Sequence, residues 1–99
     1  MLHIVNKSPT DTPNLQSCLR MAQPGHAVLL IEDGVYAATS AQADACGLAG
    51  ALTSLRVYAL QPDLDARGMG SRLLPGVTPI DYGGFVDLVT EHTNNQSWI

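Results

Sequence analysis

The chain has 99 residues, of which 45% are hydrophobic, and its formal net charge at pH 7 is −4. This length predicts a single small domain over residues 1–99, and the apolar runs are far shorter than the roughly 18 residues that a membrane-spanning helix needs. The strong cations are too few and too scattered for the basic patch of a protein that binds nucleic acid directly: Lys7, Arg20, Arg56, Arg67 and Arg72.

The first half of the chain alternates between predicted strands and helices. Residues 2–5 form an apolar strand, and Thr12 can cap a helix over residues 13–23. Residues 27–31 are a continuous apolar run, which is typical of a central parallel strand that is covered on both faces. One face of the first helix is apolar at helical spacing and is expected to be buried: Leu15, Cys18, Leu19 and Ala22.

A polar turn, Glu32-Asp33-Gly34, follows the second strand and leads into a short helix that starts at residues 35–38. We expect Gly34 to supply an unusual backbone angle and Asp33 to cap the helix, so that the turn has a structural role. The alternatives are that the Glu32 and Asp33 carboxylates act together in acid–base chemistry, or that they take part in a subunit contact.

The second half of the chain continues the alternation. Thr39 and Gln42 match a capping box for a helix over about residues 41–52. Residues 55–60 then form a third strand, and residues 62–67 form a short helix.

The chain closes with a fourth strand over residues 77–80 and a helix over residues 85–91, and Asp81-Tyr82 mark a helix start. Strands that alternate with helices in this way predict an α/β fold on a mainly parallel sheet. Such sheets place their functional groups beyond the carboxyl ends of the strands, so the turns after the strands are where a site is expected.

Several blocks occur in a fixed order along the chain: Leu2-His3, Asn6-Lys7-Ser8-Pro9, Glu32-Asp33-Gly34 with Ala37-Ala38, Val57-Tyr58-Ala59-Leu60 with Asp63-Leu64, Ala66-Arg67-Gly68, Asp81-Tyr82 with Phe85-Val86-Asp87-Leu88, and Trp98. Together they resemble the TusB/DsrH family of sulfur-relay subunits, over essentially the whole chain. The resemblance implies a three-layer α/β/α sandwich on a mainly parallel sheet of about four to five strands, as in DsrE/F/H-like proteins.

The resemblance also implies a setting in the cell. Family members are cytoplasmic and work in a heterohexamer with two related subunits, which are DsrE/DsrF-like or TusD/TusC-like, and with a small sulfur-carrier protein of the DsrC/TusE type. One branch passes persulfide sulfur toward 2-thiouridine at the wobble position of tRNA, and the other passes sulfur between carriers in dissimilatory sulfur oxidation. The Ser17-Cys18-Leu19 context resembles the DsrH branch and favours it.

Cys18 is the candidate catalytic residue, as a persulfide carrier whose thiolate accepts a sulfane sulfur and hands it on. The alternative is an inert core thiol, because Cys18 lies on the apolar stripe of the first helix and free cysteine is among the most buried residue types. In this family the main sulfur-carrying cysteine belongs to a partner chain, so the competing function is a non-catalytic structural subunit. Cys46 has no family support, and we expect it to be inert.

Three further side chains are candidates for contacts. Lys7 follows the first strand and can steady a thiolate or persulfide anion, although a solvated lysine beside a turn is the simpler interpretation. Trp98 and Ile99 end the chain, where residues are usually polar, so they either cover the domain's own core or dock on a neighbouring subunit. We favour the interface.

The sequence carries no cofactor motif. The cysteines and the histidines His3, His26 and His92 lack metal-ligand spacing, and neither a Gly-x-Gly-x-x-Gly loop nor a Walker-type loop is present. We therefore expect no metal, nucleotide or nicotinamide cofactor. A stand-alone small-molecule-binding domain is the third functional class, and it has the least support.

Overall fold

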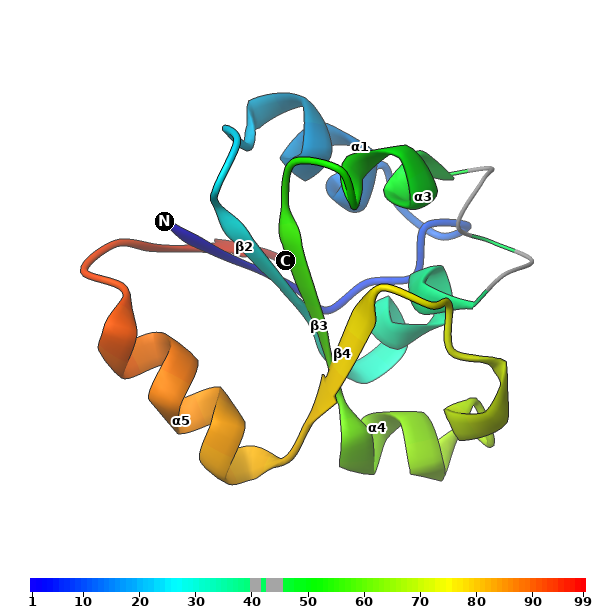
Figure 1. Ribbon diagram of the computed structural model, residues 1–99. Helices are drawn as coiled ribbons and strands as arrows, with labels where there is room; N and C mark the ends of the chain where they lie inside the picture. The colour runs from blue at the N-terminus through cyan, green and yellow to red at the C-terminus, as the bar shows by residue number, and fades with distance from the viewer. Residues whose placement is uncertain (40–41, 43–45) are drawn as a thin grey trace.

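A five-stranded sheet with the order β4-β3-β2-β1-β5 forms the centre of the computed structural model, which describes residues 1–39, 42 and 46–99. Every neighbouring pair of strands is parallel, which confirms the predicted α/β fold (Figure 1). The strands are β1 (Leu2–Val5), β2 (Ala27–Leu30), β3 (Arg56–Leu60), β4 (Val77–Ile80) and β5 (Asn95–Trp98).

The helices lie in two layers, one on each face of the sheet, which gives the expected sandwich (Figure 1). Among the described residues, no helix combines the length and the apolar character needed to cross a membrane. The helical elements are α1 (Asn14–Met21), the 3-10 helix η1 (Glu32–Ala38), α3 (Leu48–Ala51), α4 (Gln61–Ala66), the 3-10 turn η2 (Gly70–Arg72) and α5 (Tyr82–Glu91).

Side chains alternate between the two faces along each strand, so each face has its own apolar cluster. Val5 and Leu30 pair in register and bury one face against Leu15 and Cys18 of α1 and against α3, η1 and α4. The opposite face buries Leu2, Ala27 and Leu29 against Leu88 of α5. Full burial of a leucine side chain such as Leu15 contributes roughly 1.5–3 kcal/mol, so α1 is held mainly by its predicted apolar stripe.

Three helical elements differ from their predicted extents. The 3-10 helix η1 begins at Glu32, so it includes the three residues that were predicted to form a turn before it. The predicted helix over residues 41–52 lies partly outside the described residues, and in the described part Gly47 has a left-handed φ of 86° directly before α3. A continuous helix is therefore wrong at Gly47, because the left-handed conformation interrupts the helical backbone. In contrast, Asp81 does start α5: its Oδ1 accepts a hydrogen bond of 2.8 Å from the backbone N–H of Gly84, and the helix begins one turn earlier than residues 85–91.

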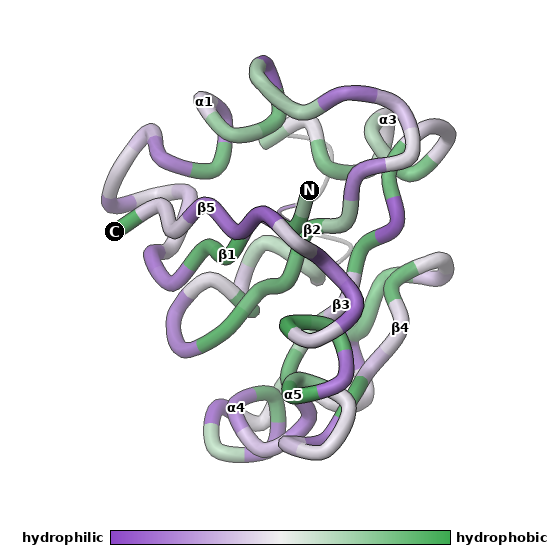
Figure 2. The backbone as a smooth tube through the Cα atoms, turned by 90° about the vertical axis from the view of Figure 1, so that its left-hand side faces the viewer, coloured by the Kyte–Doolittle hydropathy of each residue, from purple (hydrophilic) through white to green (hydrophobic). Residues whose placement is uncertain are grey.

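The strand β5 is the one element of the sheet that the sequence did not predict. Its residues are polar apart from Trp98, whereas β1 and β2 are hydrophobic (Figure 2). Its pairing with β1, from Leu2 opposite Asn95 to Val5 opposite Trp98, makes it a strand.

Candidate functional site

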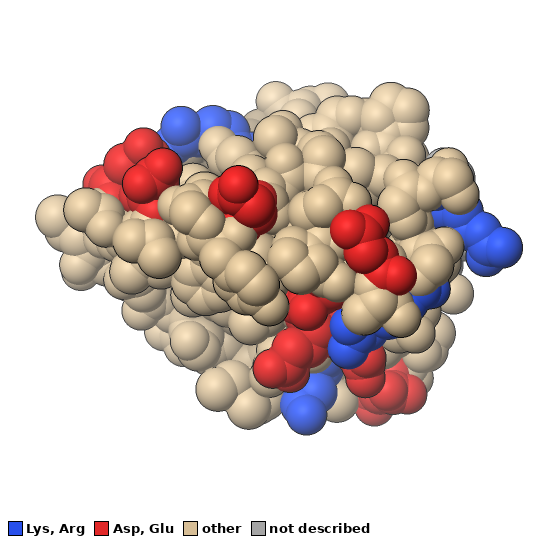
Figure 3. Space-filling model, turned by 90° about the horizontal axis from the view of Figure 1, so that it is seen from below, with Lys and Arg blue, Asp and Glu red and all other residues tan. Residues whose placement is uncertain are grey.

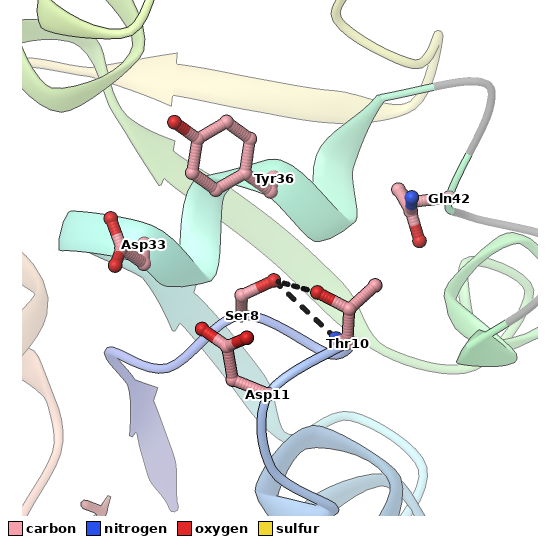
Figure 4. A pocket seen from close by; sticks show the side chains of 6 residues that line it. All are labelled: Ser8, Thr10, Asp11, Asp33, Tyr36 and Gln42. Atoms are coloured by element: carbon pink, nitrogen blue, oxygen red, sulfur yellow. Dashed lines mark hydrogen bonds between the residues drawn. The ribbon is translucent and has the colours of Figure 1, made fainter.

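An open pocket with a volume of about 280 Å³ lies where the loop after β1 meets η1, the helix that follows β2 (Figure 4). This is the carboxyl edge of the sheet, where the sequence predicts a site. Ser8 Oγ lies 3.0 Å from Thr10 Oγ1 and also accepts a 3.4 Å hydrogen bond from the backbone N–H of Thr10. Among the described residues, the lining groups are hydroxyls, carboxylates and an amide, without a thiol: Ser8, Thr10, Asp11, Asp33, Tyr36 and Gln42.

Arg67, the residue directly after α4, holds one side of this edge in place. Its Nε and Nη2 atoms lie 3.0 and 2.9 Å from Asp33 Oδ1, and its Nη1 donates a 3.2 Å hydrogen bond to the backbone carbonyl of Asp63. The guanidinium carbon is also 6.0 Å from the centre of the Tyr36 ring. The predicted cap at Asp33 is therefore wrong: the side chain caps no helix N–H, and its carboxylate pairs with Arg67 instead.

The turn after β2 holds its unusual backbone angle at Glu32, where φ is 49°. The left-handed region costs a non-glycine residue roughly 1–2 kcal/mol. A 2.7 Å hydrogen bond from the Glu32 backbone N–H to Asp63 Oδ2 stabilises it there. The prediction that Gly34 supplies this angle is wrong, because Gly34 does not have a positive φ and its role is to let η1 approach the backbone of Val5.

The structure separates the two residues for which sulfur chemistry is predicted. Cys18 faces the core from α1, is 0% exposed and does not line the pocket. Burial raises the pKa of the Cys18 thiol to about 12, so the thiolate is scarce at neutral pH. Lys7 is exposed in the loop after β1, and the described residues offer its ammonium group no ion pair. Cys46 is buried.

The two terminal apolar residues have different surroundings. The Trp98 ring packs against the core cluster on the α1 side of the sheet, and its Nε1–H donates a 3.2 Å hydrogen bond to Nδ1 of His3. Ile99 is 81% exposed. Trp98 thus covers the domain's own core, whereas Ile99 is available for contact with another molecule.

The pocket's hydroxyl residues and the His3–Trp98 bond are features that sequence reasoning missed. Ser8 and Thr10 carried a usable signal, because they directly follow the first strand, whose carboxyl end is where ligands bind. The His3–Trp98 bond carried none, because it joins the two ends of the chain through a strand that has no apolar pattern.

The described residues at this edge supply polar groups for recognition. The lining side chains can donate and accept hydrogen bonds, but they do not include a nucleophilic thiol. In the described part of the chain, no three His, Cys, Asp or Glu side chains are grouped so that they could hold a metal ion. On the face drawn in Figure 3, Lys and Arg side chains stand among acidic ones rather than in one patch.

Solved structures from Thermotoga maritima and Methanobacterium thermoautotrophicum have the same fold. The solution NMR structure of protein Tm0979 from Thermotoga maritima superposes with a TM-score of 0.65 and is 28% identical, with 93% of this chain and 94% of that chain covered. The protein MTH1491 from Methanobacterium thermoautotrophicum, described as of unknown function, has a TM-score of 0.67. It is 24% identical, with 97% of this chain and 95% of that chain covered, and this likeness concerns the fold.

Sequence comparison gives the family. The protein TusB of Shigella flexneri is 38% identical over 98 residues, which cover 99% of this chain and all of the relative. TusB of Escherichia fergusonii is also 38% identical over 98 residues. The family model described as "DsrH like protein" matches residues 7–95. The chain therefore belongs to the DsrH-like family, and its relatives at 38% identity are named TusB.

Proposed function

We propose that the chain is an accessory structural subunit of a cytoplasmic sulfur-relay, or sulfurtransferase, hetero-oligomer. Membership of the TusB/DsrH family implies a part in sulfur relay. The observation that supports the structural role is the state of Cys18, whose thiol is 0% exposed and has its pKa raised to about 12 by burial. In this proposal the subunit shapes the complex, and partner cysteines carry the sulfur.

The argument is chemical. Sulfur transfer needs a thiolate that can approach the outer sulfur of a persulfide. The Cys18 thiol lacks both properties in this fold, because α1 turns it into the core against Val5 and Leu30. The pocket at the carboxyl edge is accessible, but the side chains described in its lining do not include a thiol.

A persulfide carrier at Cys18 is the second candidate, and the Ser17-Cys18-Leu19 context in the first helix favours it. In that reaction the Cys18 thiolate attacks the outer sulfur of R–S–SH, and R–S⁻ leaves as Cys18–S–SH forms. The thiol has to reach solvent first, so this role requires α1 to open within the complex. Lys7 is the proposed side chain that would steady the anion.

Intact-protein mass spectrometry after incubation with a small-molecule persulfide distinguishes the two functions. Wild type, Cys18→Ser and Cys46→Ser are compared, as free chains and in the assembled complex. The structural role predicts no added sulfur that depends on Cys18 in either state. An added 32 Da (the mass of one sulfur) that disappears only in Cys18→Ser would replace it with the carrier role.

The proposed partners are the two related DsrE/DsrF-like (TusD/TusC-like) subunits and, through them, a carrier of the DsrC/TusE type. Exposed apolar side chains support a subunit with covered surfaces: Tyr82 and Val86 of α5 are each 62% exposed, and Ile99 ends the chain in solvent. Glu32 and Asp33 are further interface candidates at the carboxyl edge. Co-expression of the three chains followed by size-exclusion chromatography tests this assembly.

The proposed end point is 2-thiouridine in tRNA, because the 38% identical relatives carry the name TusB. Dissimilatory sulfur oxidation is the alternative that the Cys18 context favours. Nucleoside mass spectrometry of tRNA from a deletion strain decides between them. Loss of 2-thiouridine, restored by the wild-type chain, is expected, and an unchanged level would favour the oxidation branch.

A further inference from the structure

The edge strand β5 is attached to the rest of the molecule by few side-chain contacts. Of its residues, Asn95, Gln96 and Ser97 are exposed, and Trp98 is the partly buried one. Backbone pairing with β1 and the bond from the Leu2 N–H to the Asn94 carbonyl provide the remaining attachment. The surroundings of Trp98 therefore decide how firmly β5 is held.

Trp98 is fixed by a buried histidine. Its Nε1–H donates a 3.2 Å hydrogen bond to Nδ1 of His3, and His3 is only 2% exposed. An indole nitrogen can only donate a hydrogen bond, so the Nδ1 atom of His3 must be unprotonated here. A neutral His3 then carries its proton on Nε2.

A second histidine continues this chain of hydrogen bonds. Nε2 of His3 lies 3.1 Å from Nδ1 of His26, and the same Nδ1 atom accepts a 3.1 Å hydrogen bond from the backbone N–H of Gln23. His26 Nδ1 is therefore also unprotonated, and it accepts from His3. The network from Trp98 through His3 to His26 is complete only while both rings are neutral.

Adding a proton to His3 breaks this arrangement. The new N–H at Nδ1 faces the indole N–H of Trp98, so two donors oppose each other, and the charged ring remains enclosed beside His26. Within the described part of the chain, the charged groups that act on His3 do not compensate for the added charge. The Met1 amino group opposes it, and α1, which packs on β1 and β5, contributes only Arg20, whose guanidinium donates to Ser17 Oγ.

We propose that His3 and Trp98 form a pH-sensitive latch that holds β5 on the edge of the sheet, closed while His3 is neutral and open when it is protonated. Opening frees Trp98 and weakens the pairing of β5 with β1, while the core of the remaining sheet persists. The device is independent of the sulfur chemistry, since neither Cys18 nor the pocket takes part in it.

The direction of the pH dependence follows from the same surroundings. Burial, then the nearby His26 and the Met1 amino group, hold the pKa of His3 below its usual 6.5. Burial, the Met1 amino group and His92 lower the pKa of His26 as well. A lowered histidine pKa means that the open or unfolded chain takes up the proton first, so the latch is complete above pH 6.5 and weakens as the pH falls below it.

Trp98 is the chain's single tryptophan, so its fluorescence reports on the latch directly. We expect the emission maximum of the wild-type protein to move to longer wavelength as the pH falls from 7.5 to 5 (~2.5 units, spanning the ordinary histidine range), while far-UV circular dichroism keeps its helical signal. The position of the maximum is the readout, because a protonated imidazole can quench a neighbouring indole without moving it. If the emission maximum moves and the helical signal is lost over the same pH range, the whole domain unfolds, and this outcome would overturn the latch.

Two histidine variants identify the titrating group. His3→Gln removes the titration, so its Trp98 emission maximum should not change over this pH range. His92→Gln is the comparison variant: His92 lowers the pKa of His26 but stands outside the hydrogen bonds that run from Trp98 through His3 to His26, so the transition of Trp98 should persist in it. A transition that survives in His3→Gln would assign the pH response to another group.

A third variant tests the latch without relying on the folding of His3→Gln. Trp98→Phe keeps an aromatic ring but removes the indole donor, which is equivalent to opening the latch at neutral pH. Amide hydrogen exchange by NMR should show protection factors across Asn95–Trp98 that fall by on the order of five-fold at pH 7.5, the loss expected for one ordinary hydrogen bond. Unchanged protection in β5 would show that the bond to His3 does not hold the strand.

Discussion

Gly34 lies so close to the backbone of Val5 that a Cβ atom on residue 34 would collide with the Val5 carbonyl oxygen. The backbone N–H of Gly34 donates to the Ile31 carbonyl over 2.8 Å, and the Ile31 N–H donates to that same Val5 carbonyl over 3.0 Å. The end of β1 and the start of η1 are thus in direct backbone contact. This contact sets the position of one wall of the pocket.

Gly34→Ala is therefore expected to destabilise the fold by about 1–3 kcal/mol, because the obstructing atom belongs to the backbone and cannot move aside as a side chain can. Urea unfolding measures the change. Gly50→Ala is the matched control: a Cβ there meets nothing within 4 Å, and alanine in a helix is favoured over glycine by roughly 0.5–1 kcal/mol. Equal stabilities for the two variants would contradict this account of Gly34.

Asp63→Ala is expected to lower the free energy of unfolding by about 0.5–2 kcal/mol, the range seen when a side chain that caps a backbone N–H is removed. The variant leaves the Glu32 N–H without its 2.7 Å acceptor while Glu32 stays at a left-handed φ. Asp87→Ala, an exposed carboxylate on α5, serves as the control and should change stability little. The prediction fails if both variants unfold at the same urea concentration.

Stability at alkaline pH should carry the signature of Cys18. Its thiol has an ordinary pKa of 9.0, which burial raises to about 12 in the folded chain. The unfolded chain therefore loses this proton first, and the free energy of unfolding falls as the pH rises between these values, by up to about 1.4 kcal/mol per pH unit. Below pH 8 (~1 unit under the ordinary value) this group contributes no pH dependence.

Cys18→Ala isolates that contribution from the rest of the pH dependence. The difference in unfolding free energy between wild type and Cys18→Ala should be constant from pH 6 to 8. Above pH 9 (~the ordinary thiol range) the wild type should lose stability relative to Cys18→Ala. A constant difference throughout would mean that the Cys18 thiol ionises as easily in the fold as in the unfolded chain.

Val86→Asp should weaken assembly with the proposed partner subunits while leaving the isolated chain folded, because the Val86 side chain is already 62% exposed. The co-expressed complex is compared by size-exclusion chromatography, with thermal unfolding of the free chain as the folding check. Ser71→Asp introduces the same charge at an exposed position in η2 and should assemble normally. Full assembly of Val86→Asp would remove α5 from the interface.

Local patterns were enough for most of the fold. The runs at β1, β2 and β3 are largely apolar and lead into polar segments, so their strands and the α/β class follow from patterning and turn chemistry. The stripe of α1 likewise predicted that Cys18 would face the core, since helical spacing puts it beside Leu15. The family follows from the same sequence, because the family model matches residues 7–95.

Contacts between distant residues decided the rest. The sequence by itself determined that the chain turns after β2. The nearness of the Val5 carbonyl explains why residue 34 must be a glycine. Asp63, which is distant in sequence, helps to hold Glu32 at its left-handed angle. The polar sequence of β5 gives no strand pattern, and the strand forms because β1 offers it an unpaired edge. Periodicity reports which face a residue occupies, whereas register, edge pairing and a bond such as Trp98 to His3 depend on segments that meet only when the chain folds.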